Sequence, residues 1–244
     1  MITETSHRPW ELPRRPWMFA MRWHDLLFMH WPVPYAALRP LIPPALALDT
    51  FDGAAWIGIV PFRMTGVRPR GLPALPRLSA FPELNVRTYV TTGGKPGVWF
   101  FSLDATNSVV VRLARTLFYL PYYDARMASK RCGDRVHYSC QRTHRGAPPA
   151  VLQDHYRPIG RVSYAPPGTL AHWLTERYCL YAADGQGRVW RGDIHHARWP
   201  LQPAEADVQV NTLTQQIRLT LPDAPPLLHF ARRQDVVGWL PERA

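Results

Sequence analysis

Polar side chains recur at every second position in one short segment of the sequence. Glu83, Asn85, Arg87 and Tyr89 alternate there with Leu, Val and Thr. Successive side chains of a β-strand point to opposite faces, so these four residues share one face of the predicted strand. A carboxyl group near a guanidinium can supply acid–base chemistry and bind an anion. Two interpretations stay open: a solvated strand face, or a pocket with polar groups in its wall.

The segment that follows favours the pocket. A Gly93-Gly94 turn leads into Trp99, Phe100 and Phe101, so the predicted partner strand has no fully polar face. Ligand pockets combine apolar walls with a few convergent polar groups.

A second alternating segment begins at Glu176. Glu176 and Tyr178 share one face of it, and the next segment ends in His195-His196. Adjacent histidines of a strand point to opposite faces, so only one of the two enters a given site. We take Glu176, Tyr178 and His195 as candidate binding residues and leave open which histidine faces the pocket. A purely structural interpretation also stays open, in which Glu83 pairs with Arg87 and Glu176 with Arg177 inside the core.

The basic residues exclude some functions. Of the 29 Lys and Arg residues, 27 are Arg, and the two lysines are Lys95 and Lys130. Only two amines could therefore form a Schiff base. The net charge is +11, but the arginines are scattered, and we expect no nucleic-acid partner.

Known motifs are missing from the chain. It has no G-x-S-x-G, P-loop or G-x-G-x-x-G segment, and its histidines do not have the spacing of metal ligands. We therefore expect neither a cofactor nor a metal.

The cysteines and the hydropathy indicate the compartment. Cys132, Cys140 and Cys179 are odd in number and lack C-x-x-C spacing, which is typical of free thiols in a reducing compartment. No apolar run is long enough to span a membrane. We expect a cytoplasmic protein without a membrane partner, and the sequence leaves open a homo-oligomer.

Short elements with many turns should position these residues. We expect an extended arm over residues 1–16 and one domain over residues 17–240. The apolar periodicity predicts a strand at 18–31, a short helix after Pro34, and helices at 105–118 and 168–176. Turn residues predict hairpins around Asp52-Gly53, Gly93-Gly94, Cys132-Gly133-Asp134 and 184–187. Residues 66–82 are rich in Pro and Gly and predict a long surface or lid loop. The fold class is α+β, mainly antiparallel.

Several segments together resemble a known family. They are WHDLLFMHWPV, LDTFDGAAWIGIVPF, ELNVRTYV, GVWFFSLDATN, LPYYDARM, LTERYCLY and IHHARWPLQ. In this order they resemble the YqjF-like proteins, domain of unknown function 2071, over roughly residues 17–240. That family is similar to the acetoacetate-decarboxylase-like superfamily. The resemblance implies antiparallel strands wrapped into a cone or barrel around a central cavity, with few helices.

The resemblance also implies where chemistry would occur. The decarboxylases carry two consecutive lysines, the first of which forms the Schiff base, and the matching positions here are Tyr122 and Tyr123. A phenol cannot form an imine, so the resemblance does not extend to acetoacetate decarboxylation. Glu83 is the best match to a cavity carboxylate of the superfamily, with Arg87 on the same face.

Two functional hypotheses follow. In the first, the chain is an enzyme of the lyase, hydratase or isomerase type that acts on an organic acid or carbonyl compound. Arg87 or Arg115 would bind the carboxylate, Glu83 would be the acid or base, and Tyr122 or Tyr123 would donate a proton or stabilise an oxyanion. In the second, the chain is a non-catalytic module that binds or senses a small ligand.

Overall fold

A closed ring of strands is the central feature of the structure, a computed structural model that describes residues 4–76 and 78–244. In chain order the ring contains β1 (Phe19–Val33), β3 (Ala55–Pro69), β4 (Phe81–Thr92), β5 (Lys95–Ala105), β9 (Cys179–Ala183), β10 (Val189–His196) and β12 (Leu227–Gly238). Each strand pairs with two neighbours, and the pairing of β10 with β12 closes the ring. All these pairings are antiparallel except that of β5 with β9.

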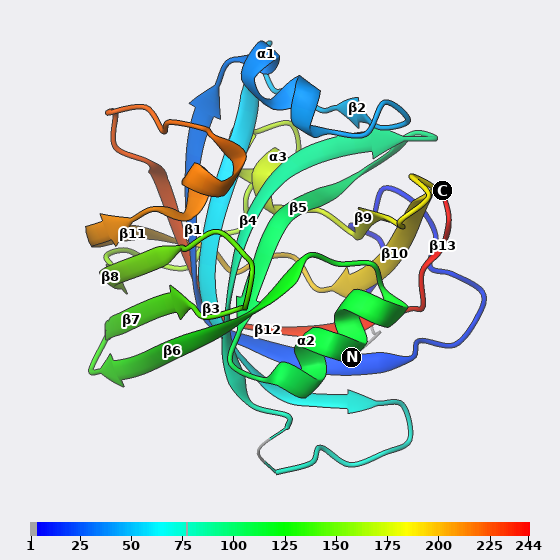
Figure 1. The fold of residues 1–244 in the computed structure, drawn as a ribbon, viewed down its shortest axis with the longest axis horizontal. Helices are drawn as coiled ribbons and strands as arrows, with labels where there is room; N and C mark the ends of the chain where they lie inside the picture. Colours follow the sequence, from blue (N-terminus) through cyan, green and yellow to red (C-terminus); the bar gives the residue numbers. More distant parts are fainter. Residues whose placement is uncertain (1–3, 77) are drawn as a thin grey trace.

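Four further strands cover one side of the ring. They are β6 (Tyr122–Cys132), β7 (Arg135–Arg142), β8 (Val151–Pro158) and β11 (Gln202–Asn211). Together they connect β5 to β12, and Figure 1 shows β6, β7 and β8 projecting to the left. The two-residue strands β2 (Ala47–Leu48) and β13 (Glu242–Arg243) pair with β4 and β10.

The helices are short. They are α1 (Tyr35–Leu38), α2 (Ser108–Leu117) and α3 (Leu170–Thr175), with 3-10 turns η1 (Arg39–Leu41) and η2 (Leu213–Ile217). The side chain of Asn107 accepts hydrogen bonds from the amides of Val109 and Val110 and so begins α2. Figure 1 shows α2 across the front of the ring. The expected mainly antiparallel fold with few helices is confirmed. No helix in residues 4–76 and 78–244 is long and apolar enough to cross a membrane.

The strands of the ring that face β6–β8 have two different sides. On β4, Leu84 and Val86 point into a filled core that they share with Tyr138 of β7 and Leu152 of β8. The alternate residues of β4, beginning with Glu83, point to the inside of the ring. The period of two along each strand therefore separates a packed core from the ring interior.

Two sequence expectations about loops are wrong. The turn at Asp52-Gly53 forms and Phe51 bridges to Ala54, but β2 pairs with β4 and not with β3, so no hairpin joins 47–48 to 55–69. The expected loop over 66–82 is shorter, because β3 continues to Pro69 and β4 begins at Phe81.

The described part of the N-terminal arm, residues 4–16, forms no strand or helix, and one of its basic residues is buried. Arg8 is 8% exposed, and its guanidinium donates to the carbonyl of Ile194 at 2.6 Å. Trp10 Nε1 donates to Asp193 Oδ1 at 3.1 Å. These contacts hold the arm against β10 and bury Arg8.

Candidate functional site

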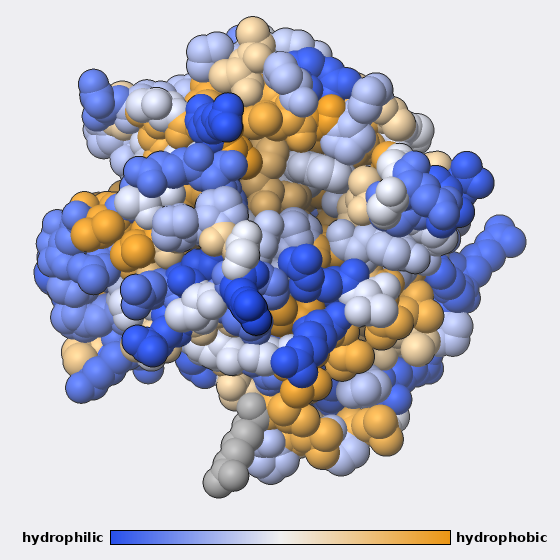
Figure 2. Space-filling model, viewed as in Figure 1, coloured by the Kyte–Doolittle hydropathy of each residue, from blue (hydrophilic) through white to orange (hydrophobic). Residues whose placement is uncertain are grey.

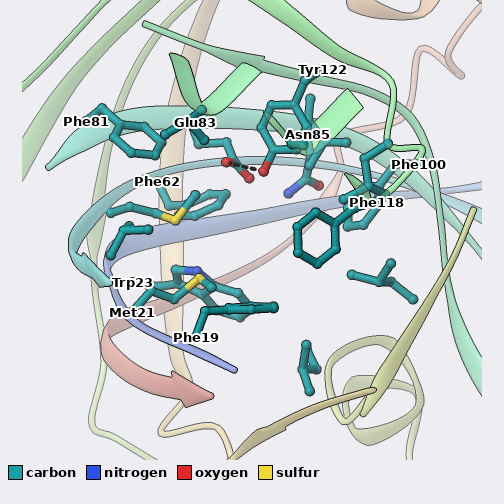
Figure 3. A pocket seen from close by; sticks show the side chains of 18 of the residues that line it. Phe19, Met21, Trp23, Phe62, Phe81, Glu83, Asn85, Phe100, Phe118 and Tyr122 are labelled. Carbon is teal, nitrogen blue, oxygen red and sulfur yellow. Dashed lines mark hydrogen bonds between the residues drawn. The ribbon is translucent and has the colours of Figure 1, made fainter. Parts of the chain in front are cut away.

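A cavity of about 470 Å³ lies inside the ring. Its walls come mainly from large apolar side chains, among them Phe19, Met21, Trp23, Phe62, Phe81, Phe100 and Phe118. Figure 3 shows them around a common space, with Glu83, Asn85 and Tyr122 projecting from one side. The predicted alternation therefore brings polar groups of β4 into an apolar cavity, the composition expected of a ligand site.

Glu83 and Tyr122 form a buried pair in this wall. The Tyr122 hydroxyl donates to Glu83 Oε2 at 2.7 Å (Figure 3). Glu83 is 3% exposed, and burial raises its pKa from 4.5 to about 8, although the Tyr122 hydrogen bond opposes the shift. Burial and the neighbouring Glu83 raise the pKa of Tyr122 well above its ordinary value. Near neutral pH, Glu83 can therefore either give or take a proton.

Asn85 and Arg87 lie farther along the same face of β4. Asn85 Oδ1 and Arg87 Nε are buried and have no hydrogen-bond partner among the described residues. The Arg87 guanidinium lies over the ring of Phe28, with Cζ 5.3 Å from its centroid. A Cβ atom added at Gly58 would come within 3.4 Å of Arg87 Cγ and 3.0 Å of His30 Cδ2, so glycine leaves room for these side chains. Buried polar atoms without partners are rare and mark places where a ligand or water can bind.

The structure adds polar residues that sequence reasoning did not assign to the site: Arg68, Ser79, Thr175, Arg177 and His196 also line the cavity. Arg177 is already paired, since its guanidinium donates to Asp49 Oδ2 at 2.7 Å. Burial lowers the pKa of His196, which keeps the imidazole neutral. Alternation along β10 showed that the two histidines diverge but gave no sign of which one faces the cavity.

His195, which we had taken as the candidate, faces the N-terminal arm. Its Nδ1 lies 3.5 Å from the Arg8 guanidinium, and it is absent from the cavity wall. Glu176 and Tyr178 also lie outside the wall. They hydrogen-bond to each other, and Glu176 accepts from the backbone amide of Trp199 at 2.9 Å.

The other two predicted residues lie behind the cavity. Tyr123 follows Tyr122 on β6 and so points the opposite way, where Arg142 stacks on its ring with Cζ 4.2 Å from the centroid. Arg115 donates to the backbone carbonyl of Tyr122 at 2.7 Å, so it supports the segment that carries Tyr122.

The proposed core ion pairs do not form within the described residues. Glu83 binds Tyr122, and Arg177 binds Asp49 in place of Glu176. The purely structural interpretation of these residues is therefore wrong in its pairing.

Both lysines lie away from the cavity wall. Lys95 is the first residue of β5, with Nζ 6.0 Å from the ring of Trp10, and Lys130 is exposed on β6. Within residues 4–76 and 78–244, no three His, Cys, Asp or Glu side chains converge closely enough to hold a metal ion.

Comparison with known proteins places the chain in a family. Residues 20–235 match domain of unknown function 2071, described as an uncharacterized conserved protein. The uncharacterized protein YqjF of Bacillus subtilis strain 168 is 47% identical over 228 residues, which are 93% of this chain and 93% of YqjF.

Solved structures show the same fold at low sequence identity. The enduracididine biosynthesis enzyme MppR with bound HEPES buffer has a TM-score of 0.65 and 11% identity, over 94% of this chain and 88% of MppR. A structure of acetoacetate decarboxylase has a TM-score of 0.64 and 13% identity, over 95% of this chain and 90% of the decarboxylase. The expected acetoacetate-decarboxylase-like fold is confirmed, and the chain belongs to the family of domain of unknown function 2071, together with YqjF.

Proposed function

We propose that the protein is an enzyme that moves a proton on an organic acid or carbonyl compound held in the cavity, in a step of the lyase, hydratase or isomerase type. The observation that carries this proposal is the buried Glu83–Tyr122 pair in an otherwise apolar wall. A carboxyl group with a pKa of about 8 is suited to general acid–base catalysis near neutral pH.

The neighbouring groups give the substrate its orientation. Arg87 has no carboxylate partner among the described residues, so its guanidinium is free to bind the carboxylate of an organic acid. Asn85, between Arg87 and Glu83 on the same face, can hydrogen-bond a carbonyl oxygen next to that carboxylate. The structural neighbour MppR has been solved in complex with pyruvate, which has this combination of groups.

The proposed chemistry does not use an imine. Tyr122 stands where the resemblance to the decarboxylases places the first lysine, and both lysines of the chain are away from the cavity wall. The Tyr122 hydroxyl would instead turn from Glu83 and donate its one hydrogen bond to the oxygen that gains charge, while Glu83 exchanges the proton. Three free cysteines are in keeping with a cytoplasmic enzyme.

Deuterium exchange tests the proposal without knowledge of the natural substrate. The protein is incubated in deuterated buffer with a panel of 2-oxo acids, and loss of the protons α to the carbonyl is followed by NMR. We expect accelerated exchange for at least one compound, and a loss of about 100-fold or more in Glu83→Gln. Tyr164→Phe, at an exposed tyrosine outside the cavity, is the control and should match the wild type.

Two results would oppose the proposal. Equal exchange by Glu83→Gln and wild type would remove Glu83 from the reaction. Binding of a compound without any exchange or other product would favour the alternative, a non-catalytic module that binds or senses a small ligand.

A further inference from the structure

The mouth of the cavity is unusually apolar for a site that takes a small polar acid. Seven residues of the cavity wall are large, apolar and 40–56% exposed: Met18, Leu75, Leu78, Val109, Leu113, Leu117 and Leu240. They come from the start of the domain, the loop between β3 and β4, α2, and the segment between β12 and β13. Hydrophobic side chains also gather at the lower edge of the face in Figure 2, where this loop lies. Contiguous exposed apolar surface on a soluble protein usually marks a binding site.

The helix α2 contributes a complete apolar stripe to this mouth. Val109, Leu113 and Leu117 are spaced by four residues and therefore lie on one side of the helix. Such a stripe normally packs against a core. Here each of the three is about half exposed and also lines the cavity, so the stripe faces the opening and solvent together.

The cavity is also too large for a three-carbon acid alone. Its volume of about 470 Å³ corresponds to roughly 15 water molecules at about 30 Å³ each. A three-carbon oxo acid has six non-hydrogen atoms and would leave more than half of the space to water against Phe and Met side chains. Filling that space with apolar groups is favourable.

Polar groups and apolar groups are separated along the cavity. The polar groups of β4 are buried or half-buried, whereas the exposed rim at the mouth consists mainly of the seven apolar residues named above. Half-buried Arg68 also lines the cavity, and its guanidinium donates to the carbonyl of Gly66 at 3.1 Å. A ligand that matches both regions has one polar end and a long apolar body.

We propose that the cavity takes an amphipathic molecule, with a carboxylate or carbonyl end at Arg87, Asn85 and Glu83 and an apolar body of about ten carbons that extends toward α2. This inference rests on the proposed function for the position of the polar end. It adds the substrate class, which neither the family nor the fold specifies.

Chain length provides the test, with butanoate, octanoate and dodecanoate as probes in titration calorimetry. Burying one methylene group is worth up to about fourfold in affinity. We expect dodecanoate to bind at least about 100-fold more tightly than butanoate. Affinity that does not change with chain length would overturn the inference.

Two variants locate the ends of the probe. Leu113→Glu places a charge on the exposed stripe. We expect it to lower the affinity for dodecanoate by about 10-fold or more and to leave the affinity for butanoate unchanged. Ile159→Glu, at a residue that is 56% exposed outside the cavity, is the matched control. Arg87→Gln should lower the affinity for dodecanoate but leave the affinity for the uncharged 1-dodecanol unchanged. Equal binding of dodecanoate by Leu113→Glu and Ile159→Glu would refute the predicted position of the tail.

The two proposals fail in different ways. If affinity depends steeply on chain length but no deuterium exchange occurs, the proposed enzyme activity is contradicted and the proposed amphipathic ligand is supported. If short oxo acids exchange in a Glu83-dependent way but affinity does not change with chain length, the proposed amphipathic ligand is contradicted and the proposed enzyme activity is supported.

Discussion

The burial of Glu83 should make the stability of the protein depend on pH, and Glu83→Gln should remove that dependence. In the folded protein the pKa of Glu83 is about 8, because burial disfavours the charged form, and its ordinary value is 4.5. Below pH 4.5 the carboxyl group is protonated in both states. Between pH 4.5 and 8 the unfolded chain loses this proton while the folded chain keeps it, so the free energy of unfolding falls as pH rises.

The size of the effect follows from the interval between the two pKa values. It spans about 3.5 pH units, and each unit corresponds to about 1.4 kcal/mol. The contribution of Glu83 therefore decreases by on the order of 5 kcal/mol between pH 4.5 and 8, and stays constant at higher pH. Because Glu83 is 3% exposed, solvent screening takes little away from this value.

Urea unfolding, followed by tryptophan fluorescence at pH 5, 6, 7, 8 and 9, can measure this change in the free energy of unfolding. The quantity to compare is the free energy of unfolding of Glu83→Gln minus that of the wild type, because other titrating groups then cancel. Glutamine stays neutral and can still accept the Tyr122 hydrogen bond. We expect the difference to grow with pH up to about 8 and then to level off.

A difference that is the same at all five pH values would refute the reasoning. It would mean that Glu83 titrates alike in the folded and unfolded protein, and the case for Glu83 as an acid near neutral pH would fall with it.

Three further substitutions test other parts of the structure. Asp154→Asn should stabilise the protein increasingly up to pH 7, because burial raises the pKa of this carboxyl group to about 7; the same urea series measures it. Asp104→Asn should lower the free energy of unfolding by about 3–5 kcal/mol, since it breaks a buried ion pair with Arg142 (Nε to Oδ1 2.6 Å) and leaves the guanidinium without its partner; a loss below 1 kcal/mol would contradict this. Gly97→Ala should lower the thermal unfolding temperature, because a Cβ atom there would lie 2.7 Å from Cys179 Sγ and 2.8 Å from the Cys179 carbonyl oxygen, where β5 meets β9; an unchanged temperature would contradict the tight contact.

Local patterns predicted much of the fold. The hairpin of β4 and β5 was predictable because Gly93 and Gly94 can both adopt the positive φ angles that a tight turn needs, and both do. Alternation along β4 likewise showed which side chains share a face, and three of them, beginning with Glu83, line the cavity.

The periodicity of a helix or strand did not predict what lies against each of its faces. The stripe on α2 has the spacing of a core-facing helix, yet Leu113 is 52% exposed at the cavity mouth. Tyr122 and Tyr123 diverge by alternation, but only the path of β6 beside β5 shows that Tyr122 is the one inside. Arg8 is buried by contacts with β10, 186 residues farther along the chain, and no local sequence signal predicts such a contact.

The strands β1, β3 and β4 are packed on one side and line the cavity on the other, so neighbouring residues of one strand stand in different environments. Leu84 and Val86 pack in the core, while their neighbours on the opposite side of β4 line the cavity. Substitutions on the cavity side can therefore change the shape and polarity of the cavity while the packed side of the same strand stays as it is.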